Sequence, residues 1–119
     1  MDSKTALIVD DSSLARMMVR KIFSTRLPEW RLLEAKDGEE ALAVDGTGLK
    51  VALLDFNMPG MNGLELAEKL MTKNPGLAVY LLTANIQERM QQKADGMGIG
   101  FIKKPIAEEK IVDILASLP

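Results

Sequence analysis

Two short runs of apolar residues, at 6–9 and 51–54, most constrain what this chain can fold into. Neither run alternates with polar residues, and this pattern is typical of a strand that helices cover on both faces of a parallel sheet. Each run stops at aspartate, the first at Asp10 and Asp11 and the second at Asp55. The sequence therefore predicts buried parallel strands whose carboxyl ends carry acidic side chains.

Three more strands are expected at 30–35, 77–82 and 101–104, and the first of them is polar enough to lie at a sheet edge. Apolar residues at helical spacing occupy the segments between the strands. The first helix is expected to begin after Ser12 or Ser13, the second to open at 37–40 and end near Gly46, and the third to run from about 64 to 73. The fourth is expected to carry Ile86, Met90 and Ala94 before the glycine-rich joint 96–100. The last is expected to place five apolar residues on one face: Ala107, Ile111, Ile114, Leu115 and Leu118. The predicted apolar face of the first helix comprises Ala15, Met18, Val19, Ile22 and Phe23.

Five strand–helix pairs in alternation predict one α/β domain, spanning 1–119, with helices on both faces of a parallel sheet and right-handed crossovers. A chain of 119 residues with 47% hydrophobic content is large enough to fill a single core. Ligands of such sheets bind at the carboxyl edge of the strands. Functional residues are therefore expected among the side chains that follow the strands.

Charge and composition exclude several classes of function. The net charge of −2 argues against direct nucleic acid binding, which normally uses a basic face. The chain has no cysteine and no histidine, so it offers no thiolate, disulfide or imidazole chemistry. Any metal is therefore expected to have oxygen ligands, and any phosphohistidine in the reaction has to belong to a partner.

The N-terminal residues show neither a basic leader nor a cleavage-site pattern, so no signal peptide is expected. No apolar run approaches the roughly 20 residues that a membrane-spanning helix needs. We therefore expect a cytoplasmic protein without membrane insertion.

The predicted strand ends bring Asp10, Asp11, Asp55, Thr83 and Lys104 to one edge of the sheet. Singly, each has an ordinary explanation, because aspartate and threonine often cap helices and lysine often lies at the surface. Together, the three carboxylates repel one another unless a divalent cation lies among them, and a site with few protein oxygens suits Mg²⁺. Lys104 adds a positive charge and Thr83 a hydroxyl that can bond a phosphoryl oxygen. This set predicts phosphoryl transfer in which Asp55 is the nucleophile and becomes an aspartyl phosphate.

Four segments resemble the motifs of bacterial response-regulator receiver domains, the CheY-like family, and the resemblance extends over essentially the whole chain. They are Leu-Ile-Val-Asp-Asp-Ser at 7–12, Leu-Leu-Asp-Phe-Asn-Met-Pro-Gly-Met-Asn-Gly at 53–63, Leu-Thr-Ala at 82–84 and Lys-Lys-Pro at 103–105. The resemblance implies a flavodoxin-like (βα)5 sheet with strand order 2-1-3-4-5. It also implies a phosphoacceptor switch of a two-component system, which catalyses only its own phosphorylation and dephosphorylation.

The family pattern implies a metal site at these positions. Asp11, Asp55 and the backbone carbonyl of Asn57 would bind Mg²⁺ directly, and Asp10 would act through water. Lys104 would contact the phosphoryl group.

The same pattern implies a switch. The peptide bond between Lys104 and Pro105 is expected to be cis. Thr83 would be the switch hydroxyl and Phe101 the switch aromatic. Phosphorylation of Asp55 would then reshape the face formed by the fourth helix, the fifth strand and the fifth helix.

The resemblance also implies partners. A sensor histidine kinase or a histidine phosphotransfer protein would donate the phosphoryl group, and a downstream effector protein or a fused output domain would respond. A phosphorylation-dependent dimer is consistent with the family. The first helix carries Arg16, Arg20 and Lys21, with Arg26 just beyond it. These residues form either a solvated basic face or part of the surface that recognises the kinase.

Three other interpretations compete with a receiver. A magnesium-dependent phosphatase of the haloacid dehalogenase type also uses aspartate, threonine and lysine, but it needs an acid at the position of Asn57. A flavodoxin-like FMN binder shares the sheet, but Asp10 and Asp11 would repel its phosphate. A degenerate receiver that only docks partners would not need the full set of site residues.

Overall fold

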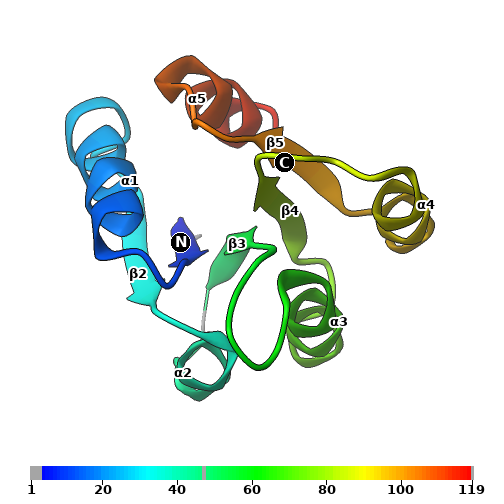
Figure 1. The fold of residues 1–119 in the computed structure, drawn as a ribbon. Coiled ribbons are helices and arrows are strands. Elements are labelled where there is room, and N and C mark those ends of the chain that lie inside the picture. Colours follow the sequence, from blue (N-terminus) through cyan, green and yellow to red (C-terminus); the bar gives the residue numbers. More distant parts are fainter. Residues whose placement is uncertain (1–3, 47, 119) are drawn as a thin grey trace.

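A parallel sheet of five strands, in the order β2-β1-β3-β4-β5, forms the middle of the molecule (Figure 1). The computed structural model describes residues 4–46 and 48–118. Residues 1–3, where no leader is expected, lie outside this range, as do 47 and 119. The strands are β1 (Thr5–Val9), β2 (Arg31–Ala35), β3 (Leu49–Asp55), β4 (Ala78–Thr83) and β5 (Gly100–Lys103). The predicted fold class and strand order are confirmed, with the polar strand β2 at an edge.

Helices alternate with the strands and cover both faces of the sheet (Figure 1). They are α1 (Ser13–Arg26), α2 (Gly38–Ala43), α3 (Gly63–Lys73), α4 (Glu88–Met97) and α5 (Glu108–Ala116). Helices α1 and α5 lie on one face, and α2, α3 and α4 lie on the other. No helix within the described ranges is both long and apolar enough to cross a bilayer.

Each strand of the sheet centre contributes to two separate cores. In β1, Ala6 and Ile8 pack with α1 and α5, whereas Leu7 and Val9 pack with the helices of the opposite face. Successive side chains of a strand point to opposite faces, so both sets of residues are buried. This two-sided burial explains why β1 lacks polar alternation.

Side-chain caps fix where the helices begin next to the carboxyl edge. Ser12 accepts a hydrogen bond from the backbone N–H of Ala15 at 3.2 Å, which confirms the predicted start of α1. Asn62 and Glu65 form a capping box at the start of α3. Gly98 ends α4 with φ of 75°, a left-handed conformation that favours glycine.

Three predicted helix positions are wrong. Ala107, predicted on the apolar face of the last helix, is exposed and precedes α5 as its N-cap residue. Helix α2 ends at Ala43 rather than near Gly46. Ile86, predicted on the apolar face of the fourth helix, precedes α4 and is 37% exposed. The reason is that Thr83 bonds the backbone of Asn85 in a turn and Gln87 is still extended, so the chain enters the helix later than the apolar spacing suggests.

The apolar face of α1 is narrower than predicted. Val19 and Phe23 are buried, but Met18 is 52% exposed. A groove of about 130 Å³ separates α1 from the segment that follows β5, and Met18 lines it together with Val19, Ile22, Pro105 and Ile106. Met18 therefore borders this groove instead of filling the core.

Replacing Phe23 with alanine should lower the free energy of unfolding by about 3–5 kcal/mol, because the ring is buried between α1 and the sheet. Met18→Ala, on a more exposed side of the same helix, is the matched control and should change stability by less than about 0.5 kcal/mol. Urea unfolding followed by circular dichroism measures both. Equal losses in the two variants would contradict the assignment of the buried face.

Candidate functional site

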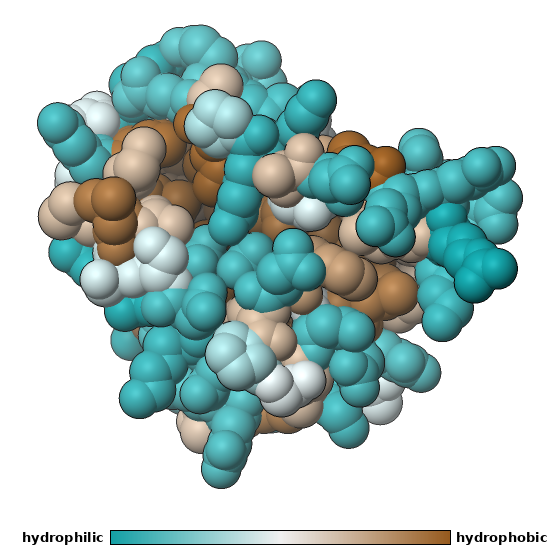
Figure 2. All heavy atoms as spheres, in the orientation of Figure 1, coloured by the Kyte–Doolittle hydropathy of each residue, from teal (hydrophilic) through white to brown (hydrophobic). Residues whose placement is uncertain are grey.

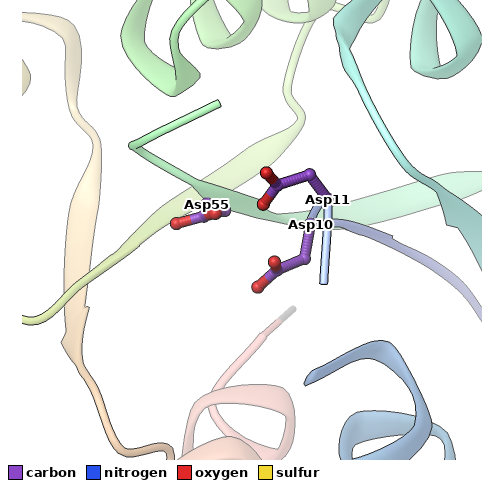
Figure 3. Close-up of side chains that lie close together, drawn as sticks. All are labelled: Asp10, Asp11 and Asp55. Carbon is purple, nitrogen blue, oxygen red and sulfur yellow. The ribbon is translucent and has the colours of Figure 1, made fainter. Parts of the chain in front are cut away.

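Three carboxylates meet where β1 and β3 end. Asp10 directly follows β1, and Asp55 is the last residue of β3. Because Val9 pairs with Leu54, the two strands end side by side. Each of Asp10, Asp11 and Asp55 offers an oxygen within 4.8 Å of the others, and Figure 3 shows the three side chains gathered at this edge. The structure thus brings together the three predicted acidic residues.

Lys104, which follows the edge strand β5, reaches across the carboxyl ends of the strands to this acidic cluster. Its Nζ donates to Asp10 Oδ2 at 3.1 Å and to Asp55 Oδ1 at 3.2 Å. Its backbone N–H donates to the Thr83 carbonyl at 2.9 Å, which ties the end of β5 to β4. The peptide bond to Pro105 is cis, as the sequence predicts.

The carboxylate of Asp10 is held on both oxygens. The Ser12 N–H donates to Oδ1 at 2.9 Å, while Lys104 binds Oδ2. The backbone N–H of Asp10 donates to the Ala35 carbonyl of β2 at 3.1 Å. Since Asp10 is only 1% exposed, these partners satisfy a buried charge that would otherwise be costly.

Burial raises the pKa of Asp55, and repulsion from Asp10 raises it further. The hydrogen bond and charge of Lys104 and the backbone N–H of Asn57 oppose this increase without cancelling it. Burial lowers the pKa of Lys104, but the hydrogen bonds and charges of Asp10 and Asp55 outweigh burial, so this pKa is raised. The site therefore keeps its lysine charged and leaves the negative charge of Asp55 incompletely balanced.

These residues fit a hard divalent cation. The cluster supplies oxygen ligands, and Asp11 is exposed, so a hydrated ion can approach it. Lys104 supplies one positive charge for three carboxylates, which leaves a net negative charge at the site. Mg²⁺ prefers this kind of site, with few carboxylates and room for water.

Of the two predicted switch residues, Thr83 lies on β4, next to the strand of Asp55, and Phe101 lies on β5, one strand further away. Thr83 is 2% exposed, and its hydroxyl donates to the Asn85 carbonyl at 3.2 Å while accepting from the Asn85 N–H at 3.3 Å. Phe101 on β5 pairs with Leu81 and packs, partly buried, against one core cluster. Thr83 lies beside Lys104, whose backbone N–H donates to its carbonyl, and the switching role of both residues stays a prediction.

Gly63 is a site residue that sequence reasoning treated only as part of a loop. A Cβ at this position would lie 2.6 Å from the backbone oxygen of Asp55 and 2.9 Å from the Phe56 Cα. Only glycine lets the start of α3 pack this closely behind Asp55. The glycine at the end of the loop was visible in the sequence, but its contact with Asp55 depends on how α3 packs.

The basic residues of α1 are largely paired within the chain. Arg16 and Arg20 both contact Glu34 of β2, and Arg26 contacts Glu108 and Glu109 of α5. A fully solvated basic face is therefore an incomplete description. Nearby, the apolar side chains Leu14, Met17 and Met18 are at least half exposed.

Comparison with known proteins places this fold and site in one family. The sequence model of the family described as response regulator receiver domain matches residues 6–116. The chemotaxis protein CheY homolog of Campylobacter jejuni is 34% identical over 120 residues, covering 93% of this chain and 92% of that protein. A probable transcriptional regulatory protein of Mycobacterium tuberculosis, TcrX, is 35% identical over 117 residues, covering 96% of this chain and 49% of that protein.

Other relatives are also longer than the matched region. A cyclic di-GMP phosphodiesterase of Thermotoga maritima is 34% identical over 103 residues, covering 86% of this chain but 27% of that protein. The chain thus spans half or less of several curated relatives that it matches. Among solved structures, the chemotaxis protein CheY4 of Vibrio cholerae superposes with a TM-score of 0.85 at 26% identity and 98% coverage of both chains. The chain belongs to the response-regulator receiver domain family, and it is a phosphoacceptor signalling domain of the CheY-like kind.

Asp55→Asn should stabilise the chain in the absence of divalent cations by on the order of 1 kcal/mol at neutral pH. A raised pKa means that the fold disfavours the ionised form, and asparagine removes that charge. The sign follows from linkage: the gain should shrink as the pH falls through the raised pKa, where Asp55 is protonated in the wild type. Chemical unfolding at several pH values measures it.

Asp113→Asn, on the exposed side of α5, is the matched control and should change stability by less than about 0.5 kcal/mol. Added Mg²⁺ should stabilise the wild type more than the Asp55→Asn variant, because the ion binds only the folded site. A loss of stability in Asp55→Asn at neutral pH would contradict the unfavourable charge balance.

Proposed function

We propose that this chain is a molecular switch that takes a phosphoryl group from a phosphohistidine of a partner protein onto Asp55, with Mg²⁺ as cofactor. The observation that carries the proposal is the cluster of Asp10, Asp11 and Asp55 with Lys104 bonded between two of them. In phosphoryl transfer a protein mainly positions the groups and neutralises charge, and this cluster supplies groups for both tasks.

In the proposed step, a carboxylate oxygen of Asp55 forms a bond to phosphorus while the bond from phosphorus to the imidazole nitrogen breaks. The imidazole leaves with the bonding electron pair and takes up a proton from water. Lys104, already 3.2 Å from Asp55, contacts the phosphoryl oxygens from the side of β5. The product is an aspartyl phosphate, and the chain acts on no other substrate.

We assign the metal ligands as Asp11, Asp55 and the backbone carbonyl of Asn57, with Asp10 acting through water. When bound, Mg²⁺ neutralises negative charge on the carboxylates and on the phosphoryl oxygens. The exposure of Asp11 supports its direct role, and the bonds of Ser12 and Lys104 to the two carboxylate oxygens of Asp10 support an indirect role for Asp10.

Thr83 and Phe101 form the proposed switch. In this structure the Thr83 hydroxyl bonds the backbone of Asn85, so it is available to exchange that partner for a phosphoryl oxygen. The exchange would free space for Phe101 to turn inward. The face formed by α4, β5 and α5 then changes shape, and α4 suits such a change because it has no side-chain cap and buries only Met90 and Ala94.

Receiver domains generally work with histidine kinases. We propose that the donor, a sensor histidine kinase or a histidine phosphotransfer protein, docks on the exposed side chains of Leu14, Met17 and Met18. The groove beside them is also lined by Lys104, so a partner seated there lies next to the phosphorylation site. Figure 2 shows apolar side chains gathered over this side of the molecule, between α1 and α5.

On the output side, we propose a downstream effector protein or a fused domain, and a dimer that forms on phosphorylation. Direct nucleic acid binding by this domain is not proposed, because its net charge is −2. A cytoplasmic location follows from the proposed donor, since such kinases phosphorylate their targets inside the cell.

Incubation with acetyl phosphate and Mg²⁺ should add one phosphoryl group to the wild-type chain, detected as a mass increase of the intact protein. Asp55→Asn should remain unmodified, and a chelator should abolish labelling of the wild type. Asp113→Asn is the matched control and should be labelled normally. Labelling of Asp55→Asn would contradict the assignment of the phosphoacceptor, whereas rapid, continuous consumption of acetyl phosphate would indicate a phosphatase.

Thr83→Ala should still be phosphorylated on Asp55, but the structural change should not extend to α4 and β5. Amide NMR of the wild type should show shifts on phosphorylation that extend from Asp55 through α4 and β5. In Thr83→Ala the shifts should stay confined to the site, because the hydroxyl that links the two regions is absent. Thr72→Ala, on the exposed side of α3, should behave as the wild type. Wild-type shifts throughout α4 and β5 in Thr83→Ala would overturn the proposed switch.

A further inference from the structure

Arg16 connects the loop that follows β1, which contains Asp10 and Asp11, to strand β2. From the first turns of α1, its Nη1 donates to the backbone carbonyl of Asp10 at 2.5 Å. Its Nε lies 3.6 Å from Glu34 Oε1, and the side chain is 19% exposed. A single guanidinium thus bridges the loop that follows β1 and the end of β2.

Glu34 is itself fixed in place. Arg20, one turn further along α1, donates to both of its carboxylate oxygens, at 2.7 and 3.0 Å. The hydrogen bond from Arg20 lowers the pKa of Glu34, so this carboxylate stays ionised as an anchor. A two-point contact of this kind holds both partners in a defined orientation.

The Asp10 carbonyl belongs to the peptide group that joins Asp10 to Asp11. The N–H of Asp10 is bound by the Ala35 carbonyl, and Arg16 binds its C=O, so both backbone polar groups of this residue are tied towards β2. Because a peptide group is planar, fixing its oxygen also fixes the direction in which the chain enters Asp11. Asp11 is the exposed acid of the cluster and has left β1 without yet entering α1.

We propose that Arg16 is a positioning residue of the magnesium site: by holding the peptide group between Asp10 and Asp11 against Glu34, it presets the direction of the Asp11 carboxylate. This inference rests on the proposed function, because it concerns how that site binds its cation. Arg16 itself is proposed to contact neither the phosphoryl group nor the metal. It acts on Asp11 through the backbone.

Charge alone predicts the opposite effect, which makes the inference testable. A guanidinium near three carboxylates disfavours a cation, so removing its charge should strengthen Mg²⁺ binding if charge were its sole influence. Positioning predicts weaker binding, because Asp11 would lose its preset direction. Groups that orient metal ligands typically change metal affinity by about 10–100-fold when removed.

The experiment measures the Mg²⁺ dissociation constant of the full chain from amide NMR shifts during a titration with MgCl₂. Arg16→Met, which keeps the aliphatic length and removes the guanidinium, should raise this constant about tenfold or more. Arg20→Met is the matched control, because it removes the same charge from the same helix. Arg20 contacts the same glutamate as Arg16 but does not touch Asp10. It should change the constant by less than about threefold.

Two further measurements separate positioning from general damage. Glu34→Gln leaves Arg16 in place but removes its anchor, so it should weaken Mg²⁺ binding in the same direction as Arg16→Met. In the acetyl phosphate reaction, Arg16→Met should need more Mg²⁺ for half-maximal labelling yet reach nearly the wild-type rate at saturation. A purely structural defect would lower the maximal rate as well.

The outcomes distinguish this inference from the proposed function. Equal or tighter Mg²⁺ binding by Arg16→Met, with a wild type that binds Mg²⁺ and is labelled on Asp55, overturns the role of Arg16 and leaves the proposed function intact. Equal weakening in Arg20→Met also overturns it, because general loss of the Glu34 pairing would then explain the effect. A wild type that neither binds Mg²⁺ nor becomes labelled overturns both.

Discussion

Repulsion among Asp10, Asp11 and Asp55 is the constraint on which the rest of the site depends. Like charges about 4 Å apart repel by about 4 kcal/mol at an effective dielectric constant of 20, which is comparable to the net stability of many domains. The sheet nevertheless forces two of these carboxylates together, because β1 and β3 are adjacent and end at the same level. Lys104 offsets part of the repulsion. The remaining repulsion favours a cation among the carboxylates.

The sheet transmits its geometry to the site through hydrogen bonds that continue the ladder past the strand ends. Asp10 donates to the Ala35 carbonyl of β2, Phe56 to the Leu82 carbonyl of β4, and Lys104 to the Thr83 carbonyl of β4, at 3.1, 3.0 and 2.9 Å. Each of these donors is a site residue or its immediate neighbour. Backbone hydrogen bonding at the strand ends therefore positions the residues of the candidate site.

The sequence predicted the fold and the acidic cluster because both depend on local patterns. Buried strands such as β1 are continuously apolar, and the topology of a parallel sheet brings the residues after them, among them Asp10 and Asp55, to one edge. What could not be predicted depends on packing between elements. The exposure of Met18 follows from the gap between α1 and the segment after β5, and the contact of Arg16 with Asp10 requires knowing which strand lies beside the loop.

Burial of β1 on both faces has a consequence for its alignment with β2 and β3. A slip of one residue along a strand exchanges its two faces, and in a strand with one polar face such a slip would be strongly penalised. In β1 both faces are apolar, so hydrophobicity alone discriminates poorly between neighbouring registers. The polar contacts of Asp10 at the strand end supply that discrimination. Asp10 is thus expected to fix the register of β1 in addition to its proposed role at the metal site. An isosteric replacement such as Asp10→Asn would separate the two roles better than truncation to alanine.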